Sequence, residues 1–248
     1  MSAPQDPGCG AAARYFIKPG YRPNEVVLTQ DEVSGEFYWN ETRLQRSVSY
    51  QYPVYRLAEC LIERGGIARV IDVGCGVATK LARLQALHPG VDYVGIDQPA
   101  TIEFCRKRYA FGRWIADDLE NPDPALANLA GDLVICSDVI EHLRDPDVLL
   151  GYLRRRTAAG GRVLLSTPER DLLRGRDCNH SPNRYHVREW NREELQAYVR
   201  ASGFVIQEHR MQLPVRVEFS RLFYSHVVKR ALAGRPVRWN QACLLGVA

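Results

Sequence analysis

Residues 69–79 read Arg-Val-Ile-Asp-Val-Gly-Cys-Gly-Val-Ala-Thr and residues 93–97 read Tyr-Val-Gly-Ile-Asp, and these two stretches decide the fold. They predict a buried strand, a glycine turn, a helix and a second buried strand that ends in a carboxylate. Such a parallel pair holds a nucleotide-like ligand at the carboxyl edge of the sheet, where Asp97 can accept hydrogen bonds from both ribose hydroxyls. Gly74 and Gly76 allow the close backbone approach that the ligand needs.

The same alternation of apolar runs and helical patterns continues through the centre of the chain. Strands are predicted at 69–73, 92–97, 112–116, 132–137, 161–167 and 204–209, and helices at roughly 77–88, 99–110, 122–130, 146–158 and 191–202. Asp145 before Pro146 marks one helix start, and Asn191 with Glu194 forms a capping-box variant at another. Alternating units of this length predict an α/β, Rossmann-like, doubly wound parallel sheet.

The residues around the glycine turn discriminate between nucleotide ligands. A dinucleotide turn requires a small residue three places after the second glycine, where this chain has Thr79. Asp72 lies directly before the glycines, and its charge suits a ligand with an ammonium group better than a diphosphate. Both residues argue against the main alternative, an NAD(P)-dependent oxidoreductase on the same sheet topology.

The Asp72-x-Gly-x-Gly turn resembles motif I of the class I S-adenosylmethionine (SAM) dependent methyltransferases. Three later segments support the resemblance: 114–119 reads Trp-Ile-Ala-Asp-Asp-Leu, 132–143 reads Asp-Leu-Val-Ile-Cys-Ser-Asp-Val-Ile-Glu-His-Leu, and 160–168 reads Gly-Gly-Arg-Val-Leu-Leu-Ser-Thr-Pro. The segment 132–143 is similar to the fourth strand of ubiquinone-type O-methyltransferases. The resemblance implies a seven-stranded sheet, mostly parallel with an antiparallel last strand, and SAM as the cofactor.

The resemblance also implies a set of cofactor contacts. An acidic side chain at Asp117 or Asp118 would contact the adenine amino group, and a neighbouring backbone amide would meet the ring. The expected cofactor-binding residues are Asp72, Gly74, Cys75, Gly76, Asp97, Gln98, Asp117, Asp118, Leu119 and Ser137.

Two histidines are candidate catalytic bases, because methyl transfer to a hydroxyl requires alignment and removal of a proton. His142 follows the fourth strand, beside carboxylates that could hold its tautomer. His186 lies in the segment 169–190, which we interpret as a polar loop with few core residues, and Asn183 and Arg184 beside it could meet a polyhydroxylated or anionic acceptor. Each histidine has a structural alternative: packing at the sheet edge for His142, and a hydrogen bond that anchors the loop for His186.

A divalent metal is conceivable at the turn after the fourth strand. Asp138, Glu141 and His142 supply two carboxylates and an imidazole, and the corresponding trio of ubiquinone-type relatives can bind a magnesium-like cation. Nothing else nearby in the sequence completes a set of ligands, so a metal is not expected.

The chain ends extend this core, which we place at 61–210. Residues 1–60 form an N-terminal extension, of which 1–20 are rich in Gly, Pro and Ala and are expected to be loose. The aromatic segments 38–43 and 50–55 either fold over the cofactor as a lid, as in similar enzymes, or pack against the sheet edge. Residues 211–248 are expected to form an excursion and a final strand at 240–248, antiparallel beside the sixth strand.

The excursion is basic. Residues 211–248 contain six Arg or Lys against one acid, Glu218, a net charge of +5, so the segment could meet nucleic acid, anionic lipid or an anionic substrate. We favour a helix with a solvated basic face, packed through Phe219, Phe223, Val227 and Ala231. A nucleic-acid acceptor is not expected, because no Asn-Pro-Pro-Tyr-like segment follows the fourth strand and no Pro-Cys nucleophile is present. An RNA methyltransferase that uses the basic segment stays an alternative.

Bulk composition is that of an ordinary globular chain: 46% of the 248 residues are hydrophobic, and seven cysteines occur singly. No apolar run approaches a membrane span and no signal peptide is evident, which predicts a cytoplasmic protein, with a homodimer as one expected assembly. The residues around Thr167-Pro-Glu-Arg170 and His186-Val-Arg-Glu-Trp190 resemble bacterial methyltransferases of polysaccharide and glycosylated-metabolite synthesis. We therefore expect an O-methyltransferase of secondary-metabolite or polysaccharide biosynthesis, acting on a hydroxylated or sugar-like small molecule.

Overall fold

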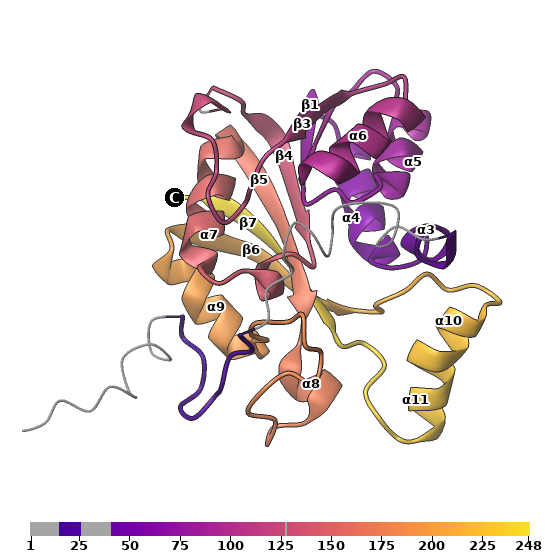
Figure 1. Ribbon diagram of the computed structural model, residues 1–248, viewed down its shortest axis with the longest axis vertical. Coiled ribbons are helices and arrows are strands. Elements are labelled where there is room, and N and C mark those ends of the chain that lie inside the picture. The colour runs from indigo at the N-terminus through magenta and orange to yellow at the C-terminus, as the bar shows by residue number, and fades with distance from the viewer. Residues whose placement is uncertain (1–14, 26–40, 127) are drawn as a thin grey trace, which may run out of the picture.

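A computed structural model describes residues 15–25, 41–126 and 128–248, which build one seven-stranded sheet with helices packed against it (Figure 1). The strand order is β3-β2-β1-β4-β5-β7-β6. The strands are β1 Arg69–Val73, β2 Asp92–Asp97, β3 Arg113–Ala116, β4 Gly131–Ser137, β5 Thr157–Pro168, β6 Phe204–Gln212 and β7 Asn240–Val247. The pairs among β1 to β5 are parallel, and β7 lies antiparallel between β5 and β6. This confirms the predicted fold class, including the antiparallel last strand.

The helices connect the strands and begin largely where the sequence indicates. They are α3 Glu41–Ser47, α4 Tyr52–Glu63, α5 Thr79–Leu87, α6 Pro99–Arg108, α7 Pro146–Arg156, α8 Arg170–Arg174, α9 Arg192–Ala201, α10 Arg221–Phe223 and α11 Lys229–Leu232, with short turns η1 Pro124–Leu126 and η2 Ile140–His142 and a π-helical turn η3 Tyr224–Val228. Asp145 caps α7, and the capping box of Asn191 and Glu194 is present at α9. No helix within the described ranges is long and apolar enough to cross a membrane.

Both faces of the sheet are buried, which explains the nearly continuous apolar strands of the sequence. Successive residues of a strand point to opposite faces, so Val70 packs into one apolar cluster and Ile71 into the other, both without exposed surface. The cluster around Val70 includes α4 and α5, and the cluster around Ile71 includes α7 and α9. The sheet is therefore a rigid support whose carboxyl edge positions the site.

One predicted helix and one predicted strand start differ from the structure. The helix expected at 122–130 is absent among the described residues, which form only the short turn η1 there. Asp117 Oδ1 accepts from Asp123 N at 2.9 Å and Asp123 Oδ1 accepts from Ala125 N at 2.8 Å. Such side-chain bonds to backbone amides compete with a helix. The fifth strand begins at Thr157, earlier than expected, because α7 ends at Arg156.

The N-terminal residues that the structure describes are packed, which corrects the expectation of a loose segment over 1–20. Tyr15, Ile17 and Tyr21 are all buried. Trp190 Nε1 donates to the carbonyl of Tyr15 at 2.9 Å, and Glu189 N donates to the hydroxyl of Tyr21 at 3.0 Å. Residues 1–14 and the segment 38–40 of the predicted lid lie outside the described residues, and the rest of the proposed lid forms the start of α3 and α4.

The excursion between β6 and β7 forms a helical arm made of α10, η3 and α11, at the lower right of Figure 1. The prediction that Phe219, Phe223, Val227 and Ala231 form one packed face is wrong. Phe219 is fully exposed and Ala231 is exposed, whereas Phe223 and Val227 are half-buried. The π-helical turn breaks the regular period, so a four-residue spacing no longer keeps side chains on one side.

Candidate active site

A single large cavity opens at the carboxyl ends of β1, β2, β4 and β5. Its volume is about 1510 Å³, which exceeds the roughly 300–1,000 Å³ of a pocket for one small ligand. The cavity lies at the ends of β1 and β4, where the strand order reverses, and open α/β sheets bind ligands at this switch point. All the predicted cofactor residues line it except Asp72, which is buried beneath it.

The glycine turn after β1 has the backbone geometry that the sequence predicted. Gly74 has φ +76°, and a Cβ on it would collide with Cγ2 of Val139 from the neighbouring strand end. Gly74 N and Cys75 N both donate to the carbonyl of Ile96, at 2.8 and 3.1 Å. Ala78 has φ +54° and directly precedes α5. Only small residues fit this turn, and the close approach leaves its backbone facing the cavity.

Asp97 is held across the turn at the end of β2. Its Oδ2 accepts from Gly76 N at 2.8 Å, and its Oδ1 accepts from Gln98 N at 2.8 Å. Burial raises the pKa of Asp97, and the two backbone hydrogen bonds oppose that rise. The carboxylate, which also accepts a hydrogen bond from the side chain of Thr101, is therefore oriented before any ligand arrives.

Asp72 sits under the turn with partners that the sequence did not reveal. The hydroxyl of Tyr55 donates to Asp72 Oδ2 at 2.8 Å, while Oδ1 has no hydrogen-bond partner in the described part of the chain. Burial raises the pKa of Asp72 to about 7. The ammonium of Lys80, which donates to the carbonyl of Ser47 at 3.0 Å, acts in the opposite direction. The sequence around Asp72 did not indicate Tyr55 or Lys80 as its partners.

The structure separates the roles of the two neighbouring acids after β3. Asp117 is buried, and its oxygens accept from Asp118 N, Asp123 N and the hydroxyl of Tyr152 at 2.8–3.0 Å. Asp118 is exposed to the cavity and accepts one hydrogen bond, from Glu120 N at 3.0 Å. Asp117 therefore braces the loop, and Asp118 presents its carboxylate beside Leu119.

Ser137 and Asp138 at the end of β4 form a polar junction with β5 and β7. The hydroxyls of Ser137 and Ser166 lie 2.8 Å apart. Asp138 has φ +55°, and its Oδ1 accepts from Ser166 Oγ at 2.8 Å and from Asn240 Nδ2 at 2.9 Å. Its Oδ2 accepts from Gln51 Nε2 at 3.1 Å. These bonds turn the Asp138 carboxylate toward the strand ends.

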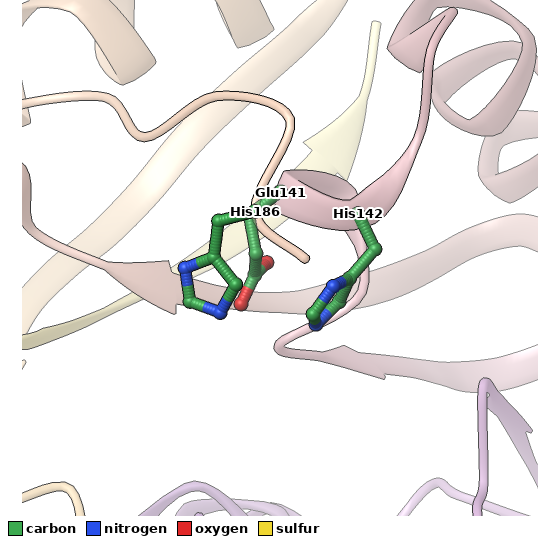
Figure 2. A group of neighbouring side chains, drawn as sticks. All are labelled: Glu141, His142 and His186. Atoms are coloured by element: carbon green, nitrogen blue, oxygen red, sulfur yellow. The ribbon is translucent and has the colours of Figure 1, made fainter. Parts of the chain in front are cut away.

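The two histidines predicted as alternative bases lie together. Figure 2 shows the side chains of His142 and His186 beside that of Glu141, and the two ring centroids are 4.8 Å apart. His142 Nδ1 donates to the carbonyl of Tyr185 at 2.7 Å, and His186 Nδ1 lies 2.6 Å from Glu189 Oε1. Because these oxygens can only accept, each ring carries its proton on Nδ1 and leaves Nε2 as an acceptor.

Burial and hydrogen bonds shift the pKa values of His142 and of Glu189, the partner of His186. Burial lowers the pKa of His142 to about 4, so this ring is neutral at pH 7. Burial tends to raise the pKa of Glu189, but hydrogen bonds from His186 and Arg174 outweigh it and hold the value at about 2. The ionised Glu189 therefore accepts the hydrogen bond from His186 Nδ1. The three-residue spacing between His186 and Glu189 is the feature of the sequence that could have indicated this pair.

The segment that carries His186 is better packed than a polar loop, which corrects the prediction. Arg170, Glu189 and Trp190 are almost completely buried, and Arg170 forms a two-pronged ion pair with Glu194 at 2.6 and 2.9 Å. Polar residues can occupy the interior when they are paired in this way. Asn183 lines the cavity; Arg184 is not among the lining residues, and its guanidinium lies over the ring of Tyr185, 4.8 Å from the centroid.

A divalent cation would fit a different trio from the predicted one. Ligand atoms of Glu141, His142 and His186 all lie within 4.8 Å of one another, and Asp138 is not a member of this group. Glu141 Oε2 accepts from Thr167 Oγ1 at 2.9 Å, while the buried Oε1 has no partner among the described residues. One free carboxylate oxygen and two imidazole acceptors, each ring anchored through its other nitrogen, match the needs of a divalent transition metal.

Comparisons with known proteins agree with this geometry. The family model described as a methyltransferase domain matches residues 43–209. A protein of Mycolicibacterium smegmatis (strain ATCC 700084 / mc(2)155), named "Probable S-adenosylmethionine-dependent methyltransferase", is 31% identical over 243 residues, covering 91% of this chain and 85% of that protein.

Two further relatives match over parts of their length. The mitochondrial ubiquinone biosynthesis O-methyltransferase of Schizosaccharomyces pombe is 28% identical over 54% of this chain and 47% of that protein. The small RNA 2'-O-methyltransferase of Mus musculus is 28% identical over 70% of this chain and 48% of that protein.

The fold matches a solved chain from the complex of the Haloferax volcanii Trm112 methyltransferase activator with a methyltransferase. The TM-score is 0.63 at 15% identity, over 84% of this chain and 94% of that chain. The matches do not support the oxidoreductase alternative. The chain belongs to the family of SAM-dependent methyltransferases, with SAM as its cofactor.

Proposed function

We propose that the protein transfers the methyl group of SAM to an oxygen atom of a hydroxylated or sugar-like small molecule. The observation that carries this proposal is the pair of His186 and Glu189, which presents a free imidazole nitrogen at the cavity wall and an ionised carboxylate behind it. Oxygen acceptors need such a base because a neutral hydroxyl is a poor nucleophile. Two of the relatives are themselves named as O-methyltransferases.

SAM would occupy the part of the cavity bounded by the glycine turn. Asp97 would accept hydrogen bonds from the ribose hydroxyls, and Asp118 would accept one from the adenine amino group, with Leu119 beside the ring. The ammonium group of SAM would lie toward Asp72, whose free Oδ1 is the uncompensated acceptor under the turn. Cys75, Gln98 and Ser137 would complete the wall of this half.

The transfer itself needs no covalent intermediate. As the acceptor oxygen attacks the methyl carbon, the carbon–sulfur bond breaks and SAM becomes S-adenosylhomocysteine. His186 Nε2 takes the hydroxyl proton, and Glu189 stabilises the imidazolium that forms. Holding oxygen, carbon and sulfur in line can lower the barrier by roughly 7–11 kcal/mol, and a positioned base adds roughly 10²–10⁴-fold. If Glu141, His142 and His186 held a divalent cation instead, His186 Nε2 would be a ligand and not the base, and the cation would supply Lewis acidity toward the acceptor oxygen.

An RNA ribose hydroxyl is the second candidate acceptor. The similarity to the small RNA 2'-O-methyltransferase extends over 207 residues, the longer of the two partial matches. The reacting group would again be a sugar hydroxyl, so the same base and cofactor geometry would serve.

The test is release of S-adenosylhomocysteine from SAM with sugars, phenols and short oligoribonucleotides as acceptors. We expect turnover with a hydroxylated acceptor, and a loss of roughly 100-fold or more for His186→Ala with nearly unchanged affinity for S-adenosylhomocysteine. His180→Ala, an exposed histidine of the same segment outside the cavity lining, is the matched control. Equal turnover of both variants would remove His186 as the base, and methylation confined to amines would overturn O-methylation.

A further inference from the structure

The acids that line the cavity lie near the strand ends, together with Lys80 and Arg144, whereas another part of the lining carries basic residues without an acid. These acids come from strand ends and the loops that follow them, including Asp97, Asp118, Asp138 and Glu141. Helix α3, helix α8 and the arm contribute basic residues to the lining and no acid. The cavity therefore has an acidic floor, where the cofactor binds, and a basic rim formed by three elements that are far apart in the sequence.

The basic residues of the arm, and Arg235 just after it, have no carboxylate partner among the described residues. Within the described ranges, no acid forms an ion pair with Lys229, Arg230 or Arg235. Arg230 instead donates to two carbonyls, those of Pro236 at 2.8 Å and Leu172 at 3.0 Å. Burial lowers the pKa of Arg230, and the nearby Arg235 and Arg174 lower it further. Lys229, Arg230 and Arg235 are thus a group of positive charges without a carboxylate partner among the described residues.

The rim lies beside the catalytic group. Arg230 joins the arm to α8 through the carbonyl of Leu172. On α8, Arg174 Nη2 donates to Glu189 Oε1 at 3.0 Å, the same oxygen that is bonded to His186. His186 and the cationic side chains line the same cavity, so a hydroxyl and an anionic group of one acceptor can occupy both places together.

We propose that the acceptor carries a phosphate group close to the hydroxyl that is methylated, and that Lys229, Arg230 and Arg235 bind this phosphate. The inference rests on the proposed function and specifies its substrate class. Arginine and lysine are the residues that bind phosphate oxygens through charge-assisted hydrogen bonds. A sugar phosphate and the backbone of an RNA present the same chemistry, and the experiment distinguishes them.

The test uses the full-length protein saturated with S-adenosylhomocysteine, because binding of that product first checks the proposed function by itself. Inorganic phosphate, glucose 6-phosphate, glucose and a hexaribonucleotide are then titrated by calorimetry at low ionic strength. We expect glucose 6-phosphate to bind at least about tenfold tighter than glucose. If the hexaribonucleotide binds more tightly than glucose 6-phosphate, RNA is the source of the phosphate. If glucose 6-phosphate binds more tightly, the acceptor is a small molecule.

Variants locate the binding site. The triple change Lys229→Gln, Arg230→Gln and Arg235→Gln should weaken binding of inorganic phosphate at least about tenfold, while the charge-conserving Arg230→Lys should keep most of it. The matched control is Arg113→Gln, Arg155→Gln and Arg200→Gln, three exposed arginines outside the cavity lining. The inference would be overturned if the two triple variants bound phosphate equally well. It would also be overturned if the wild-type protein bound glucose and glucose 6-phosphate equally well. In either case, retained binding of S-adenosylhomocysteine would leave the proposed function intact.

Discussion

At the scale of single residues, we expect the buried carboxylate of Asp72 to couple cofactor binding to a proton. Its pKa of about 7 exceeds the ordinary value of 3.8, so between these values the folded protein binds more protons than the unfolded chain. The contribution of Asp72 to stability is therefore present below pH 3.8 and is lost as the pH rises through 7. An ammonium group near this carboxylate favours its ionised form.

We expect binding of S-adenosylhomocysteine at pH 6.5 to release part of a proton from Asp72. Calorimetry in two buffers with different ionisation enthalpies measures this release, and Asp72→Asn should abolish it while keeping the bond from Tyr55. A binding enthalpy that is the same in both buffers would show that Asp72 is already ionised or lies away from the ligand.

The free Oε1 of Glu141 leads to a second prediction at this scale. If Glu141, His142 and His186 bind a divalent cation, added Mn²⁺ should raise the melting temperature of the protein, because a ligand that binds only the folded state stabilises it. Glu141→Gln should lose this shift, and Glu103→Gln, an exposed acid on α6, should keep it. A shift that is identical in both variants would place the cation elsewhere.

At the scale of secondary-structure elements, helix α9 anchors the segment that holds the pair of His186 and Glu189. Its capping residue Asn191 accepts from Glu194 N at 2.9 Å, and the Glu194 carboxylate bonds Arg170 of α8 as well as Asn191 N. Trp190 directly precedes this cap and stacks on Tyr198 of α9, with the ring centroids 5.8 Å apart. One capping box thus fixes both ends of the segment 169–190.

Asn191→Ala should lower the free energy of unfolding by about 1 kcal/mol, the usual effect of losing a helix cap. Urea denaturation measures it. Glu193→Ala, an exposed residue in the first turn of the same helix, is the control and should change stability less. A loss no larger than that of the control would mean that the ion pair between Arg170 and Glu194 holds the helix start without the cap.

At the scale of the whole molecule, the cavity is assembled from the sheet edge, α3, α8 and the arm. A ligand that bridges these parts stabilises the folded state as a unit. S-adenosylhomocysteine at a hundredfold excess over its Kd should add about 2.7 kcal/mol to the free energy of unfolding. Asp97→Asn should reduce this gain at the same ligand concentration, and urea denaturation with and without ligand would measure it. An undiminished gain would remove Asp97 from the cofactor site.

The sequence alone determined the sheet, the glycine turn and the family, because these depend on local patterns: buried parallel strands need continuous apolar runs, and the turn at Gly74 needs a residue without a Cβ. Tertiary structure alone decided that His142 and His186 meet beside Glu141, that Asp138 is not part of this group, and that the arm lies along the cavity. These arrangements depend on polar pairs between distant segments, such as Arg170 with Glu194 and His142 with the carbonyl of Tyr185. Periodicity reports which side of an element is buried, but it does not report which distant partner a polar side chain finds there.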